Sequence, residues 1–292
     1  MKKLFNKKAI LTVISVVLII SIISLFYGNF SVDVQEIHVF SEKLPESFHN
    51  YLIAHISDYH NRTSAIVDKQ IIDSLNEEKP DIIVITGDLI DSDHPEVDVS
   101  LQFTEKLCEI APVYYVTGNH ESNVNNDDVE LFNRFIEGLT ELGVNVLRND
   151  KMTIQNSAGD SINICGIEDP YFYGRYDQVF QRTEILCNGL DLDESEFNVL
   201  LAHHPETLSV YYKFNIDLVL SGHAHGGQVT FFGRAIMAPD QVTFPPYTSG
   251  LYKMGDTQLV LSRGIGYSLF PIRVFCRPHL VYAELKVPDY DK

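Results

Sequence analysis

The chain has few basic residues and few cysteines, and each shortage argues against a class of protein. Lysine and arginine total 22 against 40 aspartates and glutamates, which gives a net charge of −18. A broad basic surface for duplex nucleic acid is therefore disfavoured. The four cysteines are scattered without Cys-x-x-Cys spacing, so we expect neither a zinc finger nor a dense disulfide framework. Most of these thiols are expected in the core, with one disulfide left as an alternative.

One long hydrophobic run lies near the N-terminus. Residues 9–27 carry no charge and are long enough to span a membrane, and residues 1–8 contain four lysines. With Asp33 and Glu36 following the run, these lysines predict a cell-membrane protein with its N-terminus inside and its domain outside. No clear Ala-x-Ala cleavage site follows, so we expect an uncleaved single-pass anchor, with export after cleavage as the alternative.

The remaining length and its periodicity predict one large α/β domain. We expect a linker and an edge strand over residues 28–50 and the domain over 51–288. The first part alternates strands with helices, predicted at 51–56, 65–76, 82–86, 97–110, 113–117 and 127–142. The second part is rich in strands, with helices at 171–190 and 205–212 and strands at 144–147, 152–155, 162–167, 198–202, 217–221, 228–232, 258–262 and 279–286. This order predicts α/β layers with two facing sheets.

Polar residues gather where five of the predicted strands end. These clusters are Ser57–His60, Gly87–Asp91, Gly118–Glu121, Ala202–Pro205 and Gly222–Gln228. Open α/β sheets place their sites at the carboxyl ends of strands, so the five clusters are expected to meet. In the last cluster, His223 and His225 are two residues apart and point the same way in an extended segment. The adjoining glycines allow the backbone and a ligand to approach closely.

The clusters supply oxygen and nitrogen ligands and no thiolate. The candidate ligands are Asp58, His60, Asp88, Asn119, His203, His223 and His225. Such a set suits manganese, iron or zinc, and seven ligands exceed the need of one tetrahedral ion. We therefore expect two divalent metal ions with a bridging carboxylate, which can hold a hydroxide between them and neutralise phosphate oxygens. His120 is the best-placed residue to protonate the leaving oxygen.

Five motifs in this order resemble the calcineurin-like metallophosphoesterase family: Asp-x-His, Gly-Asp-x-x-Asp, Gly-Asn-His-Glu, His-x-Pro and Gly-His-x-His, within residues 52–286. Segments 55–61, 222–228 and 262–278 are similar to its membrane-anchored or exported YkuE-like branch. That branch also includes proteins described as UDP-2,3-diacylglucosamine pyrophosphatases. The resemblance implies a four-layer αββα sandwich and a hydrolase that cleaves phosphomonoesters or phosphodiesters.

The resemblance also implies a role for each site residue. Asp58, His60 and His225 would hold the first metal ion, Asn119, His203 and His223 the second, and Asp88 would bridge them. His120 would be the acid, held in place by Asp91 or Glu121. Two residues depart from the branch, because Tyr59 stands where leucine is usual and His279 where glutamate is usual.

Several interpretations stay open on the sequence alone. One of His203 and His204 is expected to bind metal, and the His-x-Pro pattern favours His203. Four arginines have either a substrate-groove role or a salt-bridge role: Arg62, Arg263, Arg273 and Arg277. The aromatic segments 170–176 and 244–247 would either shape an apolar entrance for a lipid-like substrate or pack in the ordinary way.

Two alternative functions accompany the phosphoesterase. The first is a pyrophosphatase for a lipid-linked sugar nucleotide, which the predicted topology opposes because that substrate is made on the cytoplasmic side. The second is a non-catalytic scaffold, which would have lost metal ligands that this chain retains. The expected substrate is a phosphate ester, either lipid-linked or nucleotide.

Overall fold

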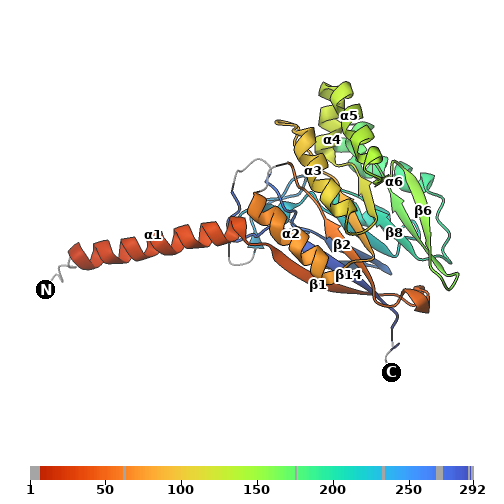
Figure 1. Cartoon of the computed structure of the whole chain (residues 1–292), viewed down its shortest axis with the longest axis horizontal. Coiled ribbons are helices and arrows are strands. Elements are labelled where there is room, and N and C mark those ends of the chain that lie inside the picture. Colours follow the sequence, from red (N-terminus) through yellow and green to blue (C-terminus); the bar gives the residue numbers. More distant parts are fainter. Residues whose placement is uncertain are drawn as a thin grey trace.

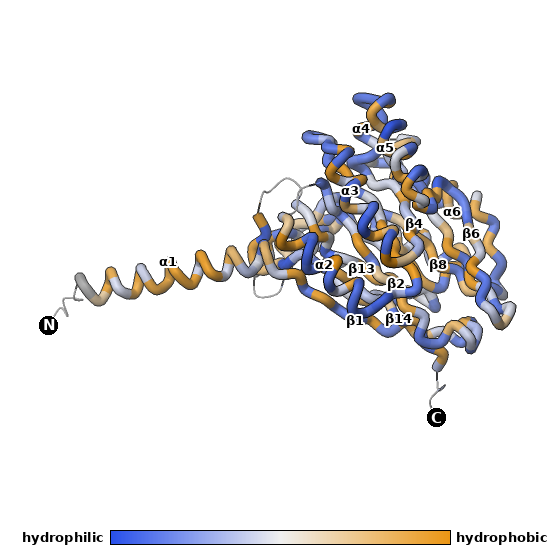
Figure 2. The backbone as a smooth tube through the Cα atoms, in the orientation of Figure 1, coloured by the Kyte–Doolittle hydropathy of each residue, from blue (hydrophilic) through white to orange (hydrophobic). Residues whose placement is uncertain are grey.

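The computed structural model describes residues 7–61, 64–174, 176–231, 234–267, 272–288 and 290. Helix α1 (Lys7–Phe30) projects from the domain as a single rod, and it is hydrophobic along most of its length (Figures 1 and 2). Ala9–Phe30 is a candidate membrane span by length and composition, properties that an N-terminal signal sequence shares. Its apolar side chains are exposed, which excludes a buried core helix. Lys2 and Lys3 lie outside the described residues.

The first sheet holds six strands in the order β1-β14-β2-β3-β4-β5. Their bounds are Asp33–Phe40, His279–Lys286, Tyr51–Ile56, Ile82–Thr86, Val113–Val116 and Asn145–Val146. Strands β2, β3, β4 and β5 are parallel to one another, whereas β14 runs antiparallel to β2. The bounds predicted for β2 and β3 are confirmed, and β4 ends one residue earlier than predicted. Parallel order brings the carboxyl ends of β2, β3 and β4 to one edge of the sheet.

Helices α2 (Ala65–Glu78), α3 (Val97–Cys108) and α5 (Val129–Glu141) cover the outer face of this sheet, and their apolar side chains share one core cluster with its strands. The helix predicted over 127–142 is confirmed as α5, with slightly shorter bounds, but the helix before it was not predicted. The chain forms a separate helix α4 (Asn119–Asp127), and Asp128 accepts a hydrogen bond from the N–H of Leu131 to begin α5. A side-chain cap of this kind satisfies an N–H that the helix itself leaves unpaired.

The second sheet also holds six strands, in the order β12-β13-β9-β8-β7-β6. Their bounds are Gly250–Met254, Thr257–Leu261, Leu218–Ser221, Asn198–Leu201, Ser161–Gly166 and Asp150–Gln155. Helices α6 (Val179–Gly189) and α7 (Leu208–Tyr211) cover its outer face. The predicted helix over 171–190 was too long, because Pro170–Phe172 and Tyr176–Gln178 are single 3₁₀ turns. The predicted strand over 228–232 is reduced to β10 (Thr230–Phe231), which pairs with β11 (Arg234–Ala235).

The two sheets pack face to face through one shared hydrophobic cluster, which includes Ile53 and Val84 from the first sheet and Val199 and Leu220 from the second. Full burial of each such side chain contributes roughly 1.5–3 kcal/mol to folding. The order of layers is therefore helix, sheet, sheet, helix. The four cysteines are free thiols, and Cys165, Cys187 and Cys276 are buried.

Candidate metal centre

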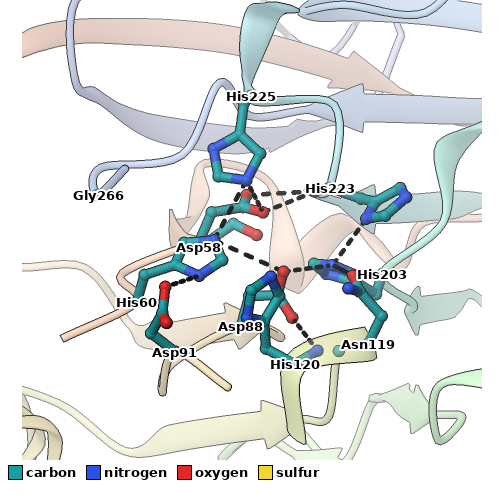
Figure 3. Close-up of polar contacts among 12 residues, drawn as sticks. Asp58, His60, Asp88, Asp91, Asn119, His120, His203, His223, His225 and Gly266 are labelled. Carbon is teal, nitrogen blue, oxygen red and sulfur yellow. Dashed lines mark hydrogen bonds and ion pairs between the residues drawn. The ribbon is translucent and has the colours of Figure 1, made fainter. Parts of the chain in front are cut away.

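Turns that follow five strands bring all of the predicted ligands together (Figure 3). Asp88 lies between two sets of side chains, since its Oδ2 is 3.6 Å from His60 Nε2 and 3.1 Å from His203 Nε2. These side chains are candidate metal ligands. We name Asp58, His60 and His225 the first ligand group, and Asn119, His203 and His223 the second ligand group. Among the residues that the structure describes, Asp88 is the carboxylate that belongs to a candidate metal cluster on each side.

The first ligand group faces inward and is fully buried. His60 Nε2 and His225 Nε2 are 3.2 Å apart, and His225 Nε2 is 3.4 Å from Asp58 Oδ1. One ligand atom from each of these residues and from Asp88 lies within 4.8 Å of the others. The Nδ1 atoms of both imidazoles are buried and make no hydrogen bond. The Asp91 carboxylate lies 3.7 Å from His60 Nδ1, and the two rings are otherwise held mainly by their backbone turns and by packing.

The second ligand group converges on His203. Its Nε2 lies 3.1 Å from Asn119 Oδ1 and 3.2 Å from His223 Nδ1. The opposite ring nitrogens are both occupied, because His203 Nδ1 is 2.7 Å from the carbonyl oxygen of Thr86 and His223 Nε2 is 2.9 Å from Asp240 Oδ2. Bonds of this kind fix the orientation of a ligating imidazole.

The turns that carry these ligands are sharp. Five ligand residues have a left-handed φ, namely Asp58 (52°), His60 (53°), Asp88 (52°), His223 (66°) and His225 (50°). Such a backbone costs roughly 1–3 kcal/mol for each residue that is not glycine, and it collects at functional sites. Gly222 is required for a different reason: an added Cβ would lie 1.8 Å from Ser57 Oγ and 2.5 Å from Asp58 Oδ2.

Burial and charge set the protonation of these groups. Burial lowers the pKa of His60 and His225 well below the usual value, so both rings are neutral and able to bind metal. Burial also opposes the protonation of His203, but the Asp88 carboxylate outweighs it and raises the pKa of His203 to about 10. Cation binding at that ring would displace a proton.

His120 reaches the same space from the start of α4 and lines a cavity of about 300 Å³ together with Asp88, Asn119 and Asp240. The backbone N–H of Ser92 donates to His120 Nδ1 over 2.9 Å. A neutral His120 therefore carries its proton on Nε2. This arrangement leaves a ring N–H available to an oxygen in the cavity.

The expected support for His120 differs from the one observed. Ser92 makes the hydrogen bonds to Nδ1, through both its N–H and its hydroxyl. The prediction that Glu121 holds His120 was wrong, because the Glu121 carboxylate accepts from backbone N–H groups of Gly118, Asp88, Leu89 and Ile90. Its burial and the nearby Asp88 raise the pKa of Glu121 to about 7. Asp91 lies 3.7 Å from His60 Nδ1 and within 4.8 Å of a ring nitrogen of His120.

Sequence reasoning missed Asp240 and Ser92. Asp240 lies in the loop between β11 and β12, far from any motif, and its carboxylate contacts His223 and accepts from the hydroxyl of Tyr171 over 2.7 Å. Ser92 directly follows the predicted cluster Gly87–Asp91, which was a local signal, whereas no local pattern marks Asp240 and only the fold brings it to the site. His204 packs beside His223, with ring centroids 4.3 Å apart. Its Nε2 lies 2.9 Å from Asp169 and its Nδ1 2.7 Å from Glu206.

The arginines for which the sequence left open a substrate-groove role or a salt-bridge role have structural contacts where the structure describes them. Arg263 and Arg277 both pair with Asp33, and the buried Arg273 donates to the carbonyl oxygens of Gly266 and Arg263. Arg62 lies outside the described residues. The buried His279 contacts Gln35 and accepts from the N–H of Arg263, so it has a structural role.

The donor chemistry fits two divalent cations. The candidate ligand atoms are imidazole nitrogens and carboxylate or amide oxygens, and they face one another at 3.1–3.6 Å. Seven side chains, six of them in two groups and Asp88 between the groups, match the donor set that manganese, iron or zinc accepts.

Comparisons with known proteins point to one family. Residues 51–227 match the model of the calcineurin-like phosphoesterases. The chain is 29% identical over 262 residues to the uncharacterized metallophosphoesterase YkuE of Bacillus subtilis, covering 84% of this chain and 82% of that protein. It is 31% identical to a zebrafish (Danio rerio) protein named a transmembrane protein with metallophosphoesterase domain, covering 87% of this chain and 57% of that protein. A metallophosphoesterase of Aquifex aeolicus is 29% identical, with 87% and 91% covered.

Proposed function

Since this chain belongs to the calcineurin-like phosphoesterase family and is a hydrolase of phosphoric esters, we propose that it cleaves phosphomonoesters or phosphodiesters at a two-ion centre on the membrane surface. The observation that carries the proposal is the position of Asp88 between two groups of metal-ligating side chains. A carboxylate in this position would hold two divalent ions together, and such a pair would supply the Lewis acidity that phosphate hydrolysis needs.

The seven ligands divide as the two groups do. Asp58, His60 and His225 would hold one ion, the second ligand group would hold the other, and Asp88 would bridge them. Two divalent ions at such a centre supply Lewis acidity and an activated water molecule. The protein supplies the geometry, because strained turns and buried carboxylates fix the donor atoms before substrate arrives.

His120 is the proposed general acid. Ser92 donates to its Nδ1, so the proton on Nε2 is available to the leaving oxygen of an ester in the cavity. Hydrolysis then consumes one water molecule and breaks one P–O bond. The alcohol leaves with the proton from His120, and the proton given up by the attacking water replaces it on His120. No covalent phospho-enzyme is required.

The membrane location rests on α1. Its apolar length and its position outside the domain support an anchor, and the lysines of residues 1–8 support an inside N-terminus with the domain outside. The pyrophosphatase alternative would use the same ligands on a lipid-linked sugar nucleotide. A reporter fused to the C-terminus and found inside the cell would favour that alternative.

The test compares bis-p-nitrophenyl phosphate with p-nitrophenyl phosphate, using the full chain in detergent with manganese, zinc or no metal. We expect metal-dependent cleavage. His120→Gln is expected to lower kcat by roughly 10²–10⁴-fold while two ions stay bound. Absence of turnover with two bound ions would refute hydrolysis of simple esters, and an unchanged kcat in His120→Gln would refute the assignment of the acid.

A further inference from the structure

A second, larger cavity lies beside the catalytic cavity. It measures about 610 Å³, and its surface is mostly apolar, with Val229, Ile236, Met237 and Ala238 in its wall. Ligand pockets commonly measure roughly 300–1,000 Å³. The two cavities share His225, Pro239 and Asp240. A ligand whose phosphate meets the metal ligands can therefore extend past Asp240 into the apolar space.

Exposed apolar side chains lie in the segments that line the larger cavity or directly next to them. Met237, Val242, Phe244 and Phe275 are each 60–72% exposed. Hydrogen bonds join their segments to the cavity wall. The N–H of Phe244 donates to the carbonyl oxygen of Ile236, and the hydroxyl of Thr230 donates to the carbonyl oxygen of Phe275. Exposed apolar groups gathered in this way mark a surface that contacts lipid, protein or ligand.

The cavity lies close to the end of α1. Asn29, in the last turn of α1, makes two hydrogen bonds with the backbone of Arg273, at 2.7 and 2.9 Å. The next residue, Val274, bonds to Gln228 and Thr230 on either side of Val229 in the cavity wall. One short segment thus joins the candidate membrane span to the apolar cavity, and α1 leaves the domain at this end (Figure 1). A bilayer around α1 would lie against the surface that carries Met237 and Phe275.

We propose that the substrate is a phosphoester of a membrane lipid, with its phosphate at the two ligand groups and an acyl chain in the 610 Å³ cavity. The proposal rests on the proposed function and narrows it to one substrate class. The continuity of the two cavities and their attachment to α1 favour an acyl chain over a second copy of this chain as the occupant. Each methylene group buried fully in an apolar site strengthens binding about fourfold.

The experiment uses the full chain in vesicles of a galactolipid, which contains no phosphate. Dibutanoyl, dihexanoyl and dioctanoyl phosphatidylglycerol are supplied as monomers and compared with glycerophosphoglycerol, and the same series is run with phosphatidic acid and glycerol phosphate. We expect kcat/KM to rise about tenfold or more for each two-carbon step in one of these series. A rate independent of chain length below the micelle threshold would overturn the proposal.

Matched variants test where the chain binds. Met237→Gln places a polar side chain of similar size in the cavity wall, and Ile185→Gln makes the same kind of change on the exposed face of α6. We expect Met237→Gln to lower kcat/KM for the dihexanoyl lipid about tenfold. Its kcat/KM for bis-p-nitrophenyl phosphate should stay within twofold of the parent value. Ile185→Gln should leave kcat/KM unchanged for both substrates. Equal effects of both variants would overturn the assignment of the cavity.

The other occupants give different results. If the surface only touches the bilayer, Phe275→Ser lowers activity on vesicle-borne lipid and the preference for chain length among monomers is absent. If a second copy of the chain covers it, light scattering shows a dimer that Met237→Gln dissociates, again without chain-length preference. Either result overturns the proposal. Loss of turnover on every ester, the soluble ones included, would instead refute the proposed function.

Discussion

Each ligand group has two histidines and one oxygen donor, Asp58 in the first and Asn119 in the second, but the two groups are held in place differently. All three residues of the first ligand group have a left-handed φ, and the Nδ1 atoms of His60 and His225 make no hydrogen bond. In the second ligand group only His223 has such a φ, and both imidazoles are fixed by partners. The first group therefore depends on backbone turns for its geometry, and the second on hydrogen bonds. This difference predicts different responses to metal removal and to mutation.

The largest effect is expected at the residue that both groups share. Asp88→Ala should lose both ions and reduce phosphodiester cleavage to background, because its carboxylate faces His60 on one side and His203 on the other. His60→Ala and His203→Ala should each lose only one ion. Metal content per chain, measured by atomic emission with circular dichroism as a folding control, checks the order. Intact activity in Asp88→Ala would refute the bridging role.

Metal removal should separate the two groups. At free metal about 100 times Kd, each ion stabilises the fold by about 2.7 kcal/mol, so chelation should lower Tm by roughly 10–20 °C. Amide hydrogen exchange should then rise more in the turn at residues 58–61 than at residues 203–205. Without a metal ion the strained first turn has no hydrogen bond at Nδ1 to hold the ring of His60, whereas the carbonyl oxygen of Thr86 still holds the ring of His203. Equal exchange in both turns would contradict the comparison.

A smaller effect is expected from the residue that orients the second group. Asp240→Ala should weaken one of the two manganese sites by about 10–100-fold, because it frees the ring of His223. Asp240→Asn keeps an acceptor oxygen, so its manganese affinity should lie between that of Asp240→Ala and that of the parent. Calorimetric titration with manganese measures both sites, with the exposed Asp256→Ala as a control. An unchanged affinity in Asp240→Ala would show that packing alone positions His223.

The sequence predicted most of the fold and the convergence of the ligands, because strand ends and short motifs are local signals. Strands β2 and β3, buried along most of their length, ended where their apolar runs ended, next to Asp58 and Asp88. Helix α4 was missed because its polar residues, Asn119 to Asp127, give no hydrophobic period. Asp240 was missed because its role arises from tertiary packing against His223 and Tyr171.

The candidate ligand histidines lie beside carboxylates, whereas another buried histidine, His55, is not among the candidate ligands. His55 on β2 is fully buried with Thr86 as its partner, and burial lowers its pKa to about 3. In the unfolded chain His55 binds a proton near pH 6.5, but in the folded chain it stays neutral at that pH. The free energy of unfolding therefore decreases as pH falls below about 6.5.

For His55 alone, the loss between pH 7.5 and 5.5 should be about 1.4 kcal/mol. Urea unfolding of the metal-free chain measures the free energy of unfolding at both pH values. Its decrease from pH 7.5 to 5.5 should be smaller by this amount in His55→Gln than in the parent. His94→Gln, which removes an exposed histidine, should keep the dependence of the parent. Equal pH dependence in all three would mean that His55 accepts its proton in the folded state, and the loss of stability in acid would then arise from the carboxylates around Asp88.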